Sequence, residues 1–236
     1  MQKKALVVDS DFFFVEFLSE LLEKRGYQVT KAYDGKEAIG KLEDLTVDIL
    51  FADLVLPKID GKQLFRYIAK KYNSRRFPMV ALSGIMIENL GSLDEIGADY
   101  FIAKGPTDGL KIKLNDFLTE METQRFSPPA EKKILAPGNI YPRRDAVELV
   151  KSLQFHQAVI ECAAVGIIIV DKDTRIINAN PALLEIVGKS SVELINCPVI
   201  KLFDERSRAK LTNGLELVMQ LVLLHLPENA DLGRIG

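Results

Sequence analysis

The chain has 236 residues, 47% of them hydrophobic and 27% charged, with a formal net charge of −2. This composition is typical of a soluble protein with one large domain or two modest ones. The slightly acidic balance gives no reason to expect nucleic-acid binding, and no apolar run reaches the roughly 18 residues of a membrane span. Two cysteines form no disulfide framework or metal motif. Because the N-terminus also lacks a signal-peptide pattern, we expect a cytoplasmic protein.

The first half alternates short apolar runs with segments of helical periodicity. Strands are predicted at 5–8, 29–32, 49–52, 79–82 and 100–103. Helices are predicted after each of them, one ending at Gly26 and the others at 36–45, 62–72, 88–96 and 110–121. Consecutive βα units predict right-handed connections. We therefore expect an α/β fold with a five-stranded, parallel, doubly wound sheet of the flavodoxin-like type.

Polar residues follow four of the predicted strands. Asp9, Asp53, Ser83 and Lys104 each come directly after an apolar run. A single such carboxylate can simply cap the next helix, but carboxyl ends of parallel strands gather at one sheet edge. A carboxylate can accept a phosphoryl group as an acyl phosphate, and magnesium prefers carboxylate ligands with phosphate oxygens and waters. Lysine and serine side chains can contact the phosphate.

The stretch around the second carboxylate carries a recognisable motif. Asp53-x-x-x-Pro57-x-x-Asp60-Gly61 resembles the phosphoacceptor loop of bacterial response-regulator receiver domains. The resemblance implies that Asp53 is phosphorylated by a histidine kinase or phosphotransfer protein of a two-component phosphorelay. It further implies the site roles, namely Mg²⁺ held by Asp9, Asp53 and the backbone carbonyl of Val55, phosphate contacts from Ser83 and Lys104, and a switch aromatic at Phe101. An aromatic residue in a strand can equally be a core residue.

Two positions depart from the receiver pattern. Receivers usually carry adjacent acids after the first strand, and here Ser10 takes the second place, with Asp11 as a further candidate ligand. Fewer charged ligands predict weaker magnesium binding. Receivers also usually have proline after the lysine, whereas this chain has Lys104-Gly105-Pro106.

The second half begins after a proline-rich segment. We expect a receiver domain at 1–122, an exposed linker at 123–144, and a second domain at 145–236 that opens with a helix over 145–161. A strand at 165–171, a hairpin partner at 175–180 and a short helix from Pro181 to Gly188 resemble the opening of a PAS domain, an α+β sensory module with an antiparallel sheet.

We expect the PAS-like domain to bind neither haem nor flavin. Asn196-Cys197 lacks the residues that follow in flavin-binding light sensors, and an inert Cys197 that acts as a small apolar residue is the favoured interpretation. The sheet looks unfinished, with a third strand expected at 221–226, so we expect a truncated domain that associates as a homodimer. No output enzyme is recognisable, and the chain is not expected to be an enzyme.

Two other functions remain open. A degenerate, non-phosphorylated receiver can act as an interaction platform. A haloacid-dehalogenase-type phosphatase would use Asp9 and Asp11 as its Asp-x-Asp pair, but Phe12-Phe13 stand where that family has Gly-Thr. Substitution separates the three functions, because the first needs Asp53, the phosphatase needs Asp9 and Asp11, and the platform needs none of these acids.

Overall fold

The computed structural model describes residues 2–72, 77–84, 96–123, 126, 133–135 and 158–214. The predicted helix at 88–96 except its last residue, most of the helix at 145–161 and the predicted strand at 221–226 lie outside these residues. The chain divides into two compact units, Met1–Ile160 and Glu161–Gly236.

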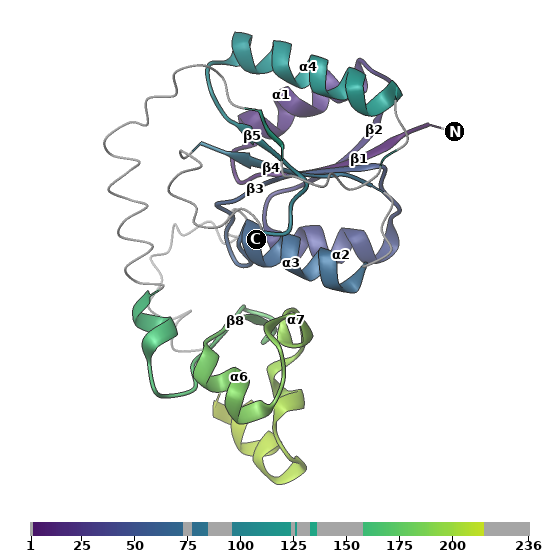
Figure 1. Ribbon diagram of the computed structural model, residues 1–236. Coiled ribbons are helices and arrows are strands. Elements are labelled where there is room, and N and C mark those ends of the chain that lie inside the picture. The colour runs from purple at the N-terminus through teal and green to yellow at the C-terminus, as the bar shows by residue number, and fades with distance from the viewer. Residues whose placement is uncertain are drawn as a thin grey trace, which may run out of the picture. The chain divides into compact units, whose positions relative to one another are not determined.

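The first unit is an α/β sandwich around a parallel sheet with strand order β2-β1-β3-β4-β5-β6. Helices α1 and α4 cover one face of the sheet and α2 and α3 cover the other (Figure 1). In chain order the elements are β1 (Lys4–Val8), α1 (Phe12–Glu23), β2 (Gln28–Ala32), α2 (Gly35–Asp44), β3 (Ile49–Asp53), α3 (Gly61–Lys71), β4 (Met79–Ser83), β5 (Tyr100–Ala103), α4 (Thr107–Thr123) and β6 (Lys133–Leu135). The five predicted strands and the doubly wound arrangement are confirmed.

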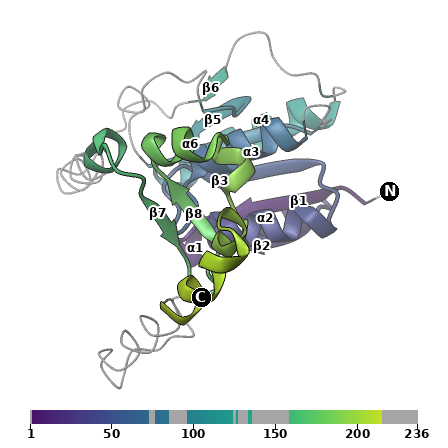
Figure 2. The same cartoon turned by 90° about the horizontal axis from the view of Figure 1, so that it is seen from below.

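The sixth strand was not expected from the sequence. Residues 133–135 lie in the predicted linker, yet β6 pairs in parallel with β5 and places Ile134 beside Phe101 in the register. Three residues among prolines and charges are too short to show a strand period. Strand β6 thus extends the sheet beyond β5 (Figure 2).

The core under α1 and α4 is apolar and aromatic. Leu18 and Leu22 of α1 are fully buried with Leu114 of α4. Phe117 of α4 lies edge-on to Tyr100 of β5 with ring centroids 5.0 Å apart. These contacts follow from the helical spacing of apolar residues, which places one stripe of each helix against the sheet.

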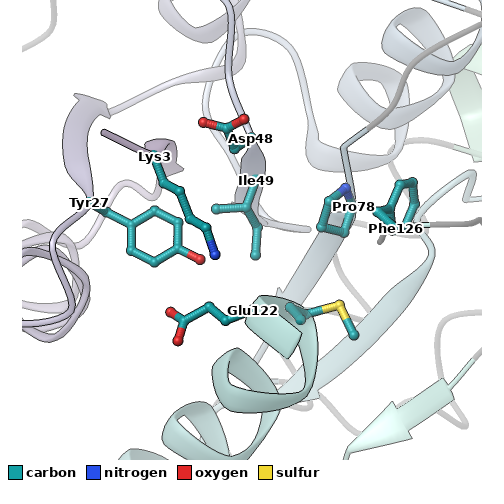
Figure 3. Close-up of a pocket in the computed structure, with 8 residues that line it drawn as sticks. Lys3, Tyr27, Asp48, Ile49, Pro78, Glu122 and Phe126 are labelled. Atoms are coloured by element: carbon teal, nitrogen blue, oxygen red, sulfur yellow. The ribbon is translucent and has the colours of Figure 1, made fainter. Parts of the chain in front are cut away.

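At the amino-terminal edge of the strands, Arg25 ties the end of α1 to α4. Its guanidinium donates to both carboxylate oxygens of Glu122, at 3.2 and 2.9 Å. This contact lowers the pKa of Glu122. Burial is the main cause that raises the pKa of Tyr27 to about 12. The side chains of Tyr27 and Glu122 line a pocket of about 230 Å³ (Figure 3). The other residues that line it are Lys3, Asp48, Ile49, Pro78, Met121 and Phe126.

The second unit begins with a β-hairpin, as the sequence predicted. Strands β7 (Ile168–Val170) and β8 (Ile176–Ala179) pair antiparallel. Helix α6 (Pro181–Val187) has Asn180 as its N-cap and Gly188 as its left-handed C-cap. A short helix α7 (Ser191–Leu194) and a 3₁₀ turn (Val199–Leu202) follow. Their small core contains Ile176, Leu183, Leu194 and Val199.

Asn180 joins the start of this unit to α6. Its side-chain oxygen accepts from the Ile167 and Leu183 amides, and its amide nitrogen donates to the Val165 carbonyl at 2.8 Å. The residue is 2% exposed, so these bonds satisfy a buried amide. Over the described ranges of both units, no helix is long and apolar enough to cross a membrane.

Candidate functional site

The polar residues at the strand ends lie together at the carboxyl edge of the parallel sheet. Asp9 follows β1, Asp53 ends β3, Ser83 ends β4 and Lys104 follows β5. The register pairs Val8 with Ala52, Asp53 with Leu82, and Ser83 with Ala103. The Lys104 amide donates to the Ser83 carbonyl at 2.7 Å, which continues the ladder beyond β5. The predicted gathering of these residues at one edge is therefore what the fold produces.

The centre of the site is a lysine between two carboxylates. The Lys104 ammonium lies 2.5 Å from Oδ2 of Asp9 and 2.5 Å from Oδ2 of Asp53. Asp9 is fully buried, and burial raises its pKa in spite of the opposing charge of Lys104. Burial opposes the charge of Lys104 as well, but the charges of Asp53 and Asp9 outweigh it and raise the pKa of the lysine. The two carboxylates thus hold a cation at one shared point.

The ring of Phe14 lies on the same lysine. The ammonium is 4.5 Å from the ring centroid, within the range of a cation–π contact. Phe14 is also partly buried against the core under α1. Helical spacing gives no indication that a partly buried phenylalanine also lies over a charged group.

The loop from β3 to α3 explains the motif residues that follow Asp53. The Val55 amide donates to Oδ1 of Asp53 at 3.2 Å. Asp60 is the N-cap of α3, where it accepts from the Gln63 amide at 2.7 Å, and burial raises its pKa. Gly61 starts the helix directly against β3. Asp60 and Gly61 therefore shape the loop and position α3.

Gly61 has no space for a side chain. A β-carbon at this position would lie 2.1 Å from the Asp53 carbonyl oxygen and 2.6 Å from the α-carbon of Leu54. Both atoms are backbone atoms, so neither can rotate away. We expect Gly61→Ala to lower the free energy of unfolding by about 2 kcal/mol, the typical cost of overpacking. Urea denaturation measures this, with Gly40→Ala as the control, because nothing lies within 4 Å of a β-carbon there. Equal stability of the two variants would contradict the close approach.

The same loop contacts the start of α2. Lys58 has a positive φ of 62° and its ammonium lies 2.8 Å from Oδ2 of Asp34. Ile59 is fully buried, and a β-carbon on Gly35 would lie 2.1 Å from the Ile59 carbonyl oxygen. This contact was not predicted, because nothing in the spacing of the sequence relates residue 34 to residue 58.

The donor atoms at the edge suit a divalent cation. Two carboxylates already share one positively charged group, and magnesium takes carboxylate ligands with waters and phosphate oxygens. Asp11 has another role here, because its carboxylate caps α1 by accepting from the Phe13 and Phe14 amides. Among the residues with assigned positions, no group of three or more Asp, Glu, His or Cys side chains could hold a metal ion. Asp9 and Asp53 therefore fit a magnesium ion as a site with two carboxylates.

Two more predicted site residues are buried in strands. Ser83 is 3% exposed at the end of β4. Phe101 is 1% exposed and lies between β4 and β6, where Ala81 and Ile134 are its register partners. Its role as a switch aromatic stays a prediction.

In the second unit, Cys197 is half-buried and its thiol donates to the Glu193 carbonyl, while both histidines lie outside the described residues.

Both halves of the chain are similar to known protein families. The family model described as "Response regulator receiver domain" matches residues 5–114, and a PAS domain model matches residues 154–219. The chain is 30% identical over 139 residues to the response regulator GtcR of Aneurinibacillus migulanus, covering 57% of this chain and 54% of that protein. It is 24% identical over 231 residues to the sensor histidine kinase TmoS of Ectopseudomonas mendocina, covering 93% of this chain and 24% of that protein. The chain thus spans about half the length of the first relative and about a quarter of the second.

Solved structures are similar to the first unit. A two-component response regulator from Clostridium difficile is 28% identical, with a TM-score of 0.46, over 53% of this chain and 100% of that one. The response regulator TrrA from Thermotoga maritima, solved with Mg²⁺ and BeF, is 25% identical, with a TM-score of 0.44, over 50% of this chain and 98% of that one. The two family matches confirm both resemblances seen in the sequence. The chain therefore carries a response regulator receiver domain of two-component signalling, followed by a PAS domain.

Proposed function

We propose that Asp53 accepts a phosphoryl group from the phosphohistidine of a histidine kinase or phosphotransfer protein. The observation that supports this most is the convergence of Asp9 and Asp53 on one cation at the carboxyl edge of the sheet. An oxygen of Asp53 attacks the phosphorus, the phosphorus–nitrogen bond breaks, and an acyl phosphate forms. The leaving histidine keeps the electron pair of that bond.

The neighbouring residues would prepare this transfer. Asp9 and Asp53, with the backbone carbonyl of Val55, would hold Mg²⁺, which when bound would neutralise the charge of the transferred group. The Val55 amide orients one oxygen of Asp53. Lys104 already reaches Asp53 and is available to pair with a phosphate oxygen, and Ser83 is proposed as a hydroxyl donor to it. Phe101 is proposed as the aromatic residue that responds to the modification.

We propose further that the receiver controls, or is controlled by, the PAS unit. The proposed arrangement is a receiver at 1–122, a connector at 123–144 that contains β6, and a PAS module at 145–236 that pairs with a second copy. Such a chain transmits a phosphorylation signal and does not itself catalyse an output reaction.

A single experiment tests the phosphoacceptor proposal. Incubation with acetyl phosphate and Mg²⁺ should add the mass of one phosphoryl group to the intact protein. Hydroxylamine should remove the added group, because it cleaves acyl phosphates. The absence of any added mass would instead favour the second candidate, a receiver that acts only as an interaction platform. Two observations favour this second candidate. Ser10 stands where receivers usually carry an acid, and Asp11 caps α1.

The magnesium site should respond to a carboxylate at position 10. Because two carboxylates converge here among the residues that the structure describes, a third at position 10 should tighten Mg²⁺ binding by about tenfold in Ser10→Asp, equivalent to about 1.4 kcal/mol. Isothermal titration calorimetry measures the dissociation constant, and Ser10→Asn, which adds no charge, serves as the control. Unchanged or weaker binding in Ser10→Asp would mean that Asp11 leaves its helix cap and already supplies the third carboxylate.

A further inference from the structure

We propose that Asp34 and Lys58 form a positioning pair, which holds the loop after Asp53 in the conformation that binds magnesium. This inference rests on the proposed function, because it assigns two residues to the same metal site. Lys58 lies in the loop five residues after Asp53, Asp34 lies nineteen residues before Asp53, and neither is one of the carboxylates that contact Lys104. Their role would be to fix the backbone that connects Asp53 to α3.

Lys58 adopts a backbone conformation that lysine disfavours. Its φ of 62° lies in the left-handed region, which glycine adopts far more readily than residues with a β-carbon. Residues in such conformations persist when surrounding contacts hold them, and they cluster at functional sites. The contact that holds Lys58 is its ion pair with Asp34, at 2.8 Å.

Asp34 is built into the fold and gives the pair a fixed anchor. Its side chain is 6% exposed, whereas that of Lys58 is 24% exposed. Its two oxygens have different partners, since Oδ1 caps α2 by accepting from the Glu37 amide at 2.8 Å and Oδ2 pairs with Lys58. An exposed ion pair contributes little because both side chains are free to move. Here one partner is buried and bonded, so the other is held in one place.

The rest of the loop shows why this anchor matters for the metal site. Gly61 is fixed against β3, and Ile59 is fixed by burial against Gly35. Val55, whose carbonyl is a proposed magnesium ligand, is 46% exposed and lies between these fixed points and Asp53. The backbone amide of Val55 donates a hydrogen bond to Oδ1 of Asp53, and this bond orients the carboxylate. The ion pair of Lys58 is the charged contact that joins this part of the loop to the neighbouring helix.

Three substitutions separate this role from general stability. Asp34→Asn removes the charge but keeps a residue that caps helices well. Lys58→Met removes the charge and keeps the length of the side chain. Lys58→Gly removes the charge and also relieves the backbone strain, so it should not lower stability through φ. The matched control is Lys71→Met, which breaks a lysine–carboxylate pair between α3 and α2, Lys71 with Glu43 at 2.9 Å, away from the site.

We expect each of the three substitutions to weaken Mg²⁺ binding about fivefold in calorimetric titration, and Lys71→Met to leave it unchanged. The double variant Asp34→Asn with Lys58→Met should bind Mg²⁺ no more weakly than either single variant, because both remove the same interaction. In the metal-free protein, hydrogen exchange of the amides of residues 54–60 should become faster, while α2 amides keep their protection. Melting temperatures measured alongside confirm that each variant is folded.

The outcomes distinguish this inference from the proposed function. If the unmodified chain binds Mg²⁺ and the three variants bind it equally well, the positioning role is wrong. If their effects on binding simply add in the double variant, the two residues act separately and the pair is also wrong. If the unmodified chain binds no Mg²⁺ and accepts no phosphoryl group, the proposed function fails. Unchanged loop exchange in the metal-free variants would then overturn the positioning pair as well.

Discussion

Asp53→Asn should abolish labelling by acetyl phosphate completely. Asparagine has nearly the same shape, but its neutral amide is a poor nucleophile and forms no acyl phosphate. The variant also removes one of the two charges that face Lys104. Intact mass spectrometry after incubation with acetyl phosphate and Mg²⁺ should show only the unmodified protein, under conditions that label the parent chain.

Asp60→Asn is the matched control for this experiment. Asp60 is a second acid in the same loop and is half-buried, and asparagine also serves as an N-cap, so α3 should still form. We expect this variant to be labelled like the parent protein. Persistence of the label in Asp53→Asn would overturn the assignment of the phosphoacceptor. A label that instead disappears only in Asp9→Asn and Asp11→Asn would favour the phosphatase alternative.

Lys104→Met should destabilise the folded protein by about 3 kcal/mol at neutral pH, because removing one partner leaves buried charges unpaired. Asp9 is fully buried and faces Asp53, and the lysine is the cation that lies 2.5 Å from both. Chemical denaturation at several pH values measures the loss. Lys104→Arg keeps the positive charge and should lose less stability, although its planar group fits the site differently.

The stability loss in Lys104→Met should depend on pH in a defined direction. Burial raises the pKa of Asp9 and the charge of Lys104 opposes that rise, so removing the lysine should raise the pKa of Asp9 further. A raised pKa in the folded state means that stability is present at low pH and is lost as the pH increases through that pKa. The difference between Lys104→Met and the parent protein should therefore grow from acidic to neutral pH. Added Mg²⁺ should reduce it. A pH-independent difference would show that the loss comes from packing alone.

Much of the candidate site could be predicted from the sequence, because the order and direction of the strands determine where the site residues lie. Once five apolar runs alternate with helices, parallel pairing brings the residue after each run to the same edge. Asp9, Asp53, Ser83 and Lys104 needed no further information to be placed together. The hairpin and the Asn180-capped helix of the PAS domain were predicted for a similar reason, since turn and cap residues act locally.

The parts that could not be predicted depend on contacts between distant segments. The spacing of residues placed Lys104 near the carboxylates but did not show that its ammonium contacts both of them and the ring of Phe14. Asp11 looked like a possible ligand because a carboxylate at a strand end can either bind a metal or cap a helix. The pairing of Asp34 with Lys58 joins two loops, and loop geometry has no periodic signal.

The sixth strand changes where the receiver can be cut. Residues 133–135 occupy the outer edge of β5, and a strand edge without a neighbour presents amides and carbonyls that can pair with another molecule. A fragment that ends after α4 would expose that edge, whereas one that continues past Leu135 would keep it covered. We expect the shorter fragment to self-associate through the exposed edge of β5. An oligomer found with such a fragment would report the position of the cut and not the biology of the protein.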